Sequence, residues 1–279
     1  MVKNILVGLR IPSLFLWTAL ASVLLVAMLG CSSSNEQRAG VGEGKADLVT
    51  DSDEPESRSR ARRYLTLAVL YFNDGKTTIA LDSLKQAIAA DPNWFEAYSL
   101  RGLIYTRLNN IPLAEDSFKR ALSLNPNAAA VQHNYGRMLC KHSRSKDGLE
   151  LFARALANPE YGERAKTLMA KGECQLEAGL PTEAEASFLR SYELDSSNPF
   201  TGYNLALLMF KRGELQRAQF YVRRLNNSES ANAESLWLGI KVDRALGNQD
   251  AVMQLGLQLQ KRFPQSREAL AFERRAFNE

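Results

Sequence analysis

The stretch YLTLAVLYFNDGKTTIALDSLKQAIAADP (residues 64–92) sets the pattern for most of this 279-residue chain. Small residues follow Ala80 at nearly constant steps of 34, 34, 36, 34 and 33 residues: Ala114, Gly148, Ala184, Ala218 and Ala251. Other positions recur at the same step: Tyr71 with Tyr105, Leu84 with Phe118 and Phe152, Ala87 with Ala121 and Ala155, and Pro92 with Pro126. A fixed period of this length indicates repeated units that stack on one another.

Each unit is predicted to be a pair of helices. The prolines of DPN (91–93) and NPN (125–127) cannot continue a helix, and the asparagines can cap the next one. Small residues at fixed sites let two helices approach closely, while large residues fill the space between units. One unit cannot bury its apolar face alone, but about six stacked units form a continuous core with a concave inner surface. We therefore predict an all-α, right-handed solenoid over residues 58–279, with a longer third connection within NPEYGERA (158–165).

The units resemble the tetratricopeptide repeat, a helix–turn–helix pair of 34 residues. The first unit carries all eight signature residues: Tyr64, Leu67, Ala68, Tyr71, Ala80, Leu84, Ala87 and Pro92. The second unit has Arg101 where leucine is usual, and the sixth unit is the most divergent, as terminal repeats tend to be.

The N-terminal segment has the pattern of a targeting signal. Lys3 and Arg10 precede the apolar run SLFLWTALASVLLVAMLG (13–30), which ends at Cys31 and three serines. LGC resembles the lipobox of bacterial lipoprotein precursors, with Met28 where leucine is usual. The resemblance implies that residues 1–30 are removed as a signal peptide and that Cys31 is acylated. The run is also nearly long enough to span a bilayer, so an uncleaved anchor is the alternative.

Residues 31–57 are rich in serine, glycine and acidic residues, with little to bury, and we predict a flexible tether. The chain has a formal charge of +4, and without Lys3 and Arg10 it has 33 basic against 31 acidic residues. This near balance lacks the excess of positive charge that is typical of nucleic-acid-binding proteins.

The stretch QHNYGRMLCKH (132–142) holds both histidines and Cys140, which suggests a metal or nucleophile site. On one helix, however, His133 and Cys140 lie roughly 10 Å apart along the axis, and His142 lies on the opposite side from His133. Zinc ligands must converge within about 2.0–2.3 Å of one ion, so these three residues cannot share a metal. The sequence also has no glycine-rich phosphate loop and no Gly-x-Ser-x-Gly or His-Glu-x-x-His motif. We predict a protein without catalytic activity, cofactor, metal or small-molecule substrate.

Cys140 and Cys174 lie on the predicted first helices of adjacent units. We expect two half-buried free thiols, with a disulfide as the alternative if the two Cα atoms lie within about 7 Å.

In the repeat family, ligands usually bind the concave face, which is lined by the first helix of each unit. This resemblance assigns a partner-binding groove to Leu65, Val69, Phe72, Leu103, Arg107, His133, Arg137 and Lys141. A second apolar patch falls in the fifth unit, at Phe200, Tyr203, Leu207 and Phe210. An apolar groove of this kind suits an extended or helical peptide. The alternative is that some of these side chains pack on the next unit, or are covered by the N-terminal segment.

The lipobox, the tether and the six units together resemble the type IV pilus biogenesis/stability lipoproteins of the PilW family, also called PilF. The more specific matches are Asn134-Tyr135-Gly136 and Trp237-Leu238-Gly239-Ile240, where Trp237 replaces an aliphatic residue. The resemblance implies a lipid-anchored outer-membrane pilotin that faces the periplasm, binds the type IV pilus secretin, and promotes its outer-membrane localisation and multimerisation. A scaffold lipoprotein of another envelope machine, for outer-membrane protein insertion or cell-wall synthesis, is the alternative.

Overall fold

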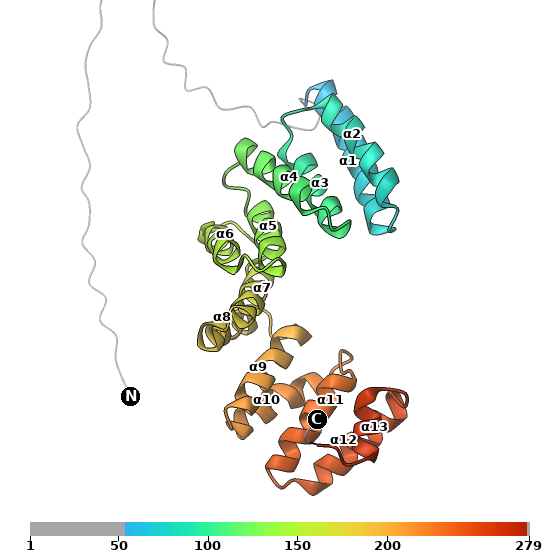
Figure 1. The fold of residues 1–279 in the computed structure, drawn as a ribbon, viewed down its shortest axis with the longest axis vertical. Helices are drawn as coiled ribbons and strands as arrows, with labels where there is room; N and C mark the ends of the chain where they lie inside the picture. The colour runs from blue at the N-terminus through green and yellow to red at the C-terminus, as the bar shows by residue number, and fades with distance from the viewer. Residues whose placement is uncertain (1–53, 278–279) are drawn as a thin grey trace, which may run out of the picture. The chain divides into compact units, whose positions relative to one another are not determined.

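The computed structural model describes residues 54–277, which contain thirteen α-helices and no β-strand (Figure 1). The predicted signal peptide, Cys31 and most of the predicted tether lie outside the described residues. None of the helices within residues 54–277 is long and apolar enough to cross a membrane.

Twelve of the helices form six consecutive antiparallel pairs, and α13 (Arg267–Glu273) follows the last pair. The pairs are α1 (Glu56–Asn73) with α2 (Thr77–Ala90), α3 (Phe95–Arg107) with α4 (Ile111–Leu124), α5 (Ala129–Lys141) with α6 (Ser145–Ala157), α7 (Arg164–Glu177) with α8 (Pro181–Leu194), α9 (Pro199–Lys211) with α10 (Leu215–Asn226), and α11 (Ala233–Ala245) with α12 (Gln249–Arg262). The second helix of each unit packs on the first helix of the next, which builds a solenoid of tetratricopeptide repeats. The predicted all-α repeat fold is confirmed.

In units two, three and four the two helices meet at a glycine and a phenylalanine. A Cβ atom added to Gly102 would lie 2.6 Å from the Phe118 ring, and one added to Gly172 would lie 2.7 Å from the Phe188 ring. Both phenylalanines are fully buried. The missing glycine side chain therefore makes room for an aromatic ring against the backbone of the facing helix, as the small-residue pattern predicted.

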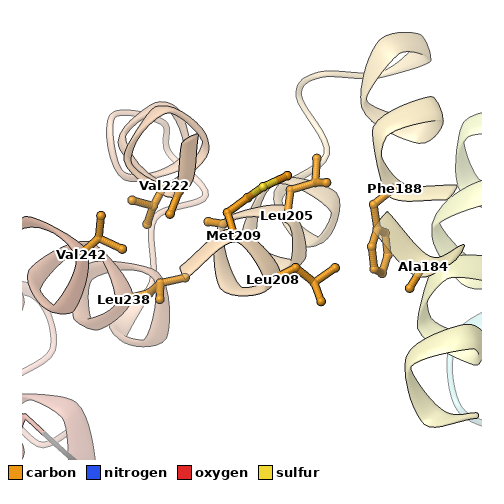
Figure 2. Close-up of a cluster of buried hydrophobic side chains, with 10 residues drawn as sticks. Ala184, Phe188, Leu205, Leu208, Met209, Val222, Leu238 and Val242 are labelled. Carbon is orange, nitrogen blue, oxygen red and sulfur yellow. The ribbon is translucent and has the colours of Figure 1, made fainter. Parts of the chain in front are cut away.

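Large residues continue this core from one unit into the next. Leu205, Leu208 and Met209 of α9 lie between Phe188 of α8 and Leu238 of α11 (Figure 2). Because these side chains belong to three successive units, the core is continuous along this part of the chain. A large-to-small change there is expected to cost about 2–5 kcal/mol.

Two residues after each first helix ends, the chain has a residue with positive φ. The residue is glycine in four units, whereas units two and three use Asn109 (φ 55°) and Ser143 (φ 61°). The left-handed conformation satisfies carbonyl groups at the helix end and turns the chain tightly toward the second helix. Asparagine tolerates this region better than most residues, while Ser143 adopts it without that advantage.

The connection between α6 and α7 holds residues 158–163, whereas residues 91–94 and 125–128 suffice to join the earlier units. The extra length lies within the stretch 158–165, as predicted. It contributes Tyr161, which is buried and whose hydroxyl lies 2.9 Å from Thr167 Oγ1 of α7. The insertion therefore adds a side chain to the junction between units three and four.

Cys140 and Cys174 form a disulfide, so the expectation of two free thiols is wrong. Their Cα atoms lie 5.5 Å apart because α5 and α7 are first helices in contact and the two cysteines are 34 residues apart. A Cβ atom on Gly148 would lie 2.5 Å from Cys140 Sγ, so the small residue of unit three also makes room for the bridge.

Candidate partner-binding site

The apolar part of the predicted groove lies on α1 and α3. Leu65, Phe72 and Leu103 are half-buried and pack against the core clusters of units one and two, while Val69 is 39% exposed. These side chains therefore stabilise the fold, and part of their surface stays open to solvent. Such an edge can accept an apolar side chain from a partner while its own position is fixed by packing.

Arg107 of α3 is fixed on Phe72 of α1. Its guanidinium carbon lies 3.7 Å from the centre of the phenyl ring, and its Nη1 donates a hydrogen bond of 2.5 Å to the carbonyl oxygen of Phe72. A cation–π contact of this kind contributes about 0.5–1 kcal/mol at an exposed site. Arg107 thus joins the first two units at the predicted groove.

His133 does not line an open groove, and its assignment to the groove is corrected. The side chain is 1% exposed because its face of α5 packs toward α7. Its Nδ1 lies 2.8 Å from Thr167 Oγ1, and its ring lies 5.8 Å from the ring of Phe152. Burial, followed by the positive charges of Arg137 and Lys166, lowers the pKa of His133 from 6.5 to about 4. The residue is therefore neutral at neutral pH and holds units three and four together.

Arg137 and Lys141 are exposed one turn apart on α5. Across from them on α7, burial raises the pKa of the Glu173 carboxyl, and the charges of Arg137 and Lys141 oppose that shift. Glu177 adds a further negative charge that raises the pKa of Glu173. The middle units thus present mixed charge beside the apolar side chains of the predicted groove on units one and two. The part of the chain that the structure describes holds no cluster of three metal-ligating side chains.

A cavity that the sequence did not reveal lies between α9, α11 and α13. Its volume is about 350 Å³, and it is lined by Tyr203, Leu207, Glu234, Trp237, Leu238, Lys241, Arg267, Glu268 and Ala271. Trp237 stacks on Phe277 with ring centres 5.6 Å apart, and Lys241 Nζ lies 5.7 Å from the centre of the Trp237 ring. The apolar patch of unit five indicated one wall, but the repeat pattern did not predict α13, which forms another.

Comparison with known proteins supports both the repeat assignment and the resemblance to a family of pilus proteins. Models of the tetratricopeptide repeat match residues 61–93, 95–128 and 136–199. The type IV pilus assembly protein PilF of Pseudomonas aeruginosa is 27% identical over 255 residues, which are 91% of this chain and 97% of that protein.

Two solved structures of pilus proteins superpose on the chain. The structure of Pseudomonas aeruginosa PilF is 25% identical, covers 79% of this chain and all of its own, and has a TM-score of 0.72. The structure of PilW, a widely conserved type IV pilus biogenesis factor, is 31% identical, with a TM-score of 0.68 over 76% of this chain and 97% of its own. The resemblance predicted from the repeat motifs is confirmed, and the chain belongs to the PilF/PilW family of tetratricopeptide-repeat proteins of type IV pilus biogenesis.

Proposed function

We propose that this protein is a pilotin, an outer-membrane lipoprotein that binds the type IV pilus secretin and promotes its outer-membrane localisation and multimerisation. The observation that carries the proposal is the likeness to PilF and PilW over nearly the whole chain. The proposed function is binding, and no bond is made or broken.

The proposed anchor is Cys31, which follows Leu29 and Gly30. Burial of acyl chains contributes about 0.8 kcal/mol per CH₂ group, so one chain binds a membrane marginally while several hold a protein there essentially permanently. The proposed tether before α1 gives the repeat domain reach into the periplasm.

The proposed secretin site is the groove of units one and two, formed by Leu65, Val69, Phe72 and Leu103 and bordered by Arg107. A secretin segment held in this groove by an anchored protein is confined to a thin layer at the correct membrane. The effective concentration of secretin subunits rises there, which favours their assembly without additional contacts between them.

The anchor is tested in a strain that lacks the gene and is complemented with the full chain or with its Cys31→Ser variant. We expect the wild-type chain to restore secretin multimers in the outer membrane, and the variant to fractionate as a soluble periplasmic protein that does not. Normal secretin multimers in the uncomplemented strain would reject the proposed function. A membrane-bound variant would reject lipidation and favour the uncleaved anchor.

The groove is tested with a pair of variants on unit one. Val69→Asp places a charge in the groove, and Ile79→Asp makes the same kind of change on α2, where the side chain is also exposed. We expect Val69→Asp to reduce the amount of secretin that co-purifies with the chain at least tenfold and Ile79→Asp to leave it unchanged. Equal recovery with both variants would remove the groove from the proposal.

A further inference from the structure

The cavity between α9, α11 and α13 has an apolar side that continues onto open surface. Phe200 is 64% exposed, and it shares a face of α9 with Tyr203 and Leu207 because the three residues are spaced by three and four positions. Tyr203 and Leu207 line the cavity, together with Trp237 and Leu238 of α11. An apolar segment lying along α9 would therefore run from an exposed phenyl ring into a shaped hollow.

Trp237, which forms one wall of the cavity, is held in place by residues that do not line it. The ring of Phe277 stacks on Trp237, and the guanidinium carbon of Arg244 lies 4.2 Å from the centre of the Phe277 ring. Phe272 also meets Phe277 edge to face, at 6.3 Å between ring centres. Because Trp237 is fixed on its far side, the cavity is formed before any ligand arrives, and binding does not require the indole to be ordered.

Two cations, Lys241 and Arg267, line the cavity, and their positive charge is incompletely balanced. Lys241 is half-buried, and within residues 54–277 no carboxylate lies at ion-pair distance from its ammonium group. Burial lowers the pKa of Lys241, and the charge of Arg267 lowers it further. Arg267 itself makes a contact of 3.4 Å with Glu268. A partly dehydrated ammonium group beside a second cation attracts an anion that can enter the cavity.

Two carboxylates also line the cavity, Glu234 near the start of α11 and Glu268 beside Arg267 on α13. Burial raises the pKa of the Tyr203 hydroxyl, and the negative charges of Glu234 and Glu268 raise it further. Glu268 already has Arg267 as a partner, whereas Lys241 lies two turns along α11 from Glu234 and is the cation left to pair with an anionic ligand group. The cavity thus combines the apolar row along α9 with an ammonium group that can take a carboxylate.

We propose that this cavity is a second peptide site, which binds a segment of a partner polypeptide carrying an acidic residue next to an apolar one. The apolar side chain contacts Phe200 and Leu207, and the carboxylate pairs with Lys241. The inference deepens the proposed function and rests on it in one respect, because the secretin is the partner expected to supply the segment. A second contact in units five and six would hold that partner at both ends of the repeat domain.

The test uses the full-length chain and an array of overlapping 15-residue peptides, which covers the periplasmic part of the type IV pilus secretin and an unrelated periplasmic protein. The strongest binder is then synthesised as a pair, with its acidic residue intact or changed to the amide, and both affinities are measured by fluorescence anisotropy. We expect the amide peptide to bind at least tenfold more weakly. Lys241→Gln should weaken the acidic peptide to the same extent and abolish the difference within the pair, while Lys241→Arg should retain it.

Phe200→Ala should weaken both peptides of the pair about fivefold. The matched controls are Lys261→Gln on α12 and Phe220→Ala on α10, which change the same residue types at exposed positions and should leave both affinities unchanged. Thermal unfolding of each variant, followed by circular dichroism, confirms that the variants are folded.

Wild-type affinity in both Lys241→Gln and Phe200→Ala would overturn the second site. If secretin peptides bind and are lost only with Val69→Asp, the second site is rejected while the proposed function stands. If only peptides of the unrelated protein bind, and do so through Lys241 and their acidic residue, the second site stands and the secretin assignment is rejected.

Discussion

The junctions between inner units and the outer face of unit one use the same repeat position with opposite results. The position is occupied by Leu70, Ile104, Met138, Cys174 and Leu208 in units one to five. Met138 and Cys174 are each 1% exposed because the preceding unit covers them, whereas Leu70 is 59% exposed because no unit precedes it within the described residues. Burial at this position is thus decided by the neighbouring unit and not by the residue, since leucine is found both inside and outside.

A second position shows the same contrast. Ala97, Val131, Thr167 and Thr201 are buried at successive units, while the equivalent Arg63 of unit one is exposed. At this position the residue type also changes, because a charged arginine is favourable on a face exposed to water whereas smaller residues pack between units. The junction between units three and four has a disulfide and a buried histidine, whereas the junction between units one and two has an apolar core and the surface contact of Arg107 with Phe72.

The largest difference is expected between Met138→Ala and Leu70→Ala. Met138→Ala leaves a cavity between units and should lower the free energy of unfolding by about 2–5 kcal/mol. Leu70→Ala removes an exposed side chain and should change it by no more than about 0.5 kcal/mol. Urea unfolding followed by circular dichroism measures both. An equally large effect at Leu70 would show that another segment covers the face of unit one.

Removing the disulfide should rank next. The bridge closes a loop of 34 residues, and breaking a loop of this size typically lowers the free energy of unfolding by about 2–4 kcal/mol. The measurement is urea unfolding of the double variant Cys140→Ala, Cys174→Ala. Reducing agent should destabilise the wild-type chain and leave the double variant unaffected. A wild-type chain that is indifferent to reduction would contradict the contribution of the bridge.

The junction between units three and four should also weaken in acid. The pKa of His133 falls from 6.5 to about 4 on folding, so the neutral ring contributes stability that is fully present above pH 6.5 and is lost as the pH falls toward 4. The shift corresponds to about 3 kcal/mol once the pH is below both values. Unfolding of the wild-type chain and of His133→Gln, measured between pH 7 and 4, tests this. The acid-dependent loss should be smaller in His133→Gln than in the wild type and in His142→Gln, which changes an exposed histidine.

The smallest effect is expected at the first junction. Arg107→Ala removes the cation–π contact and a hydrogen bond to Phe72, and should lower the free energy of unfolding by about 0.5–1 kcal/mol. Arg107→Lys keeps the charge but not the planar group, and should recover only part of the loss. An effect as large as that of Met138→Ala would mean that this contact matters as much to the first junction as the buried Met138 does to the junction between units two and three.

The repeat made most of the fold predictable from the sequence. The period fixed the order of the helices, and Ala80, Ala114 and Phe118 were placed in the core because small and large residues alternate at fixed sites. The extra length between α6 and α7 was equally visible as a step of 36 residues.

The repeat period does not determine the distance between side chains on adjacent first helices. The choice between free thiols and a disulfide at Cys140 and Cys174 depends on a Cα separation of 5.5 Å, which no spacing along the chain determines. His133 was assigned to the groove because its repeat site faces the concave side in the family, but its ring is buried and its Nδ1 lies within hydrogen-bond distance of Thr167 Oγ1 on α7. The C-terminal cavity requires α13, which follows the most divergent unit and packs on α11 and α12 without a second helix to complete a seventh pair among the described residues.

The disulfide also changes how the chain would transmit a pulling force. A repeat domain that is pulled at its two ends is loaded along its backbone. The bridge between Cys140 and Cys174 diverts that load across the side chains, so residues 141–173 are not stretched even when the helices around them unfold. At about 3.3–3.6 Å per residue, roughly 110 Å of chain is withheld from extension. The loop closed by the bridge therefore limits how far the middle of the repeat domain can extend under such a load.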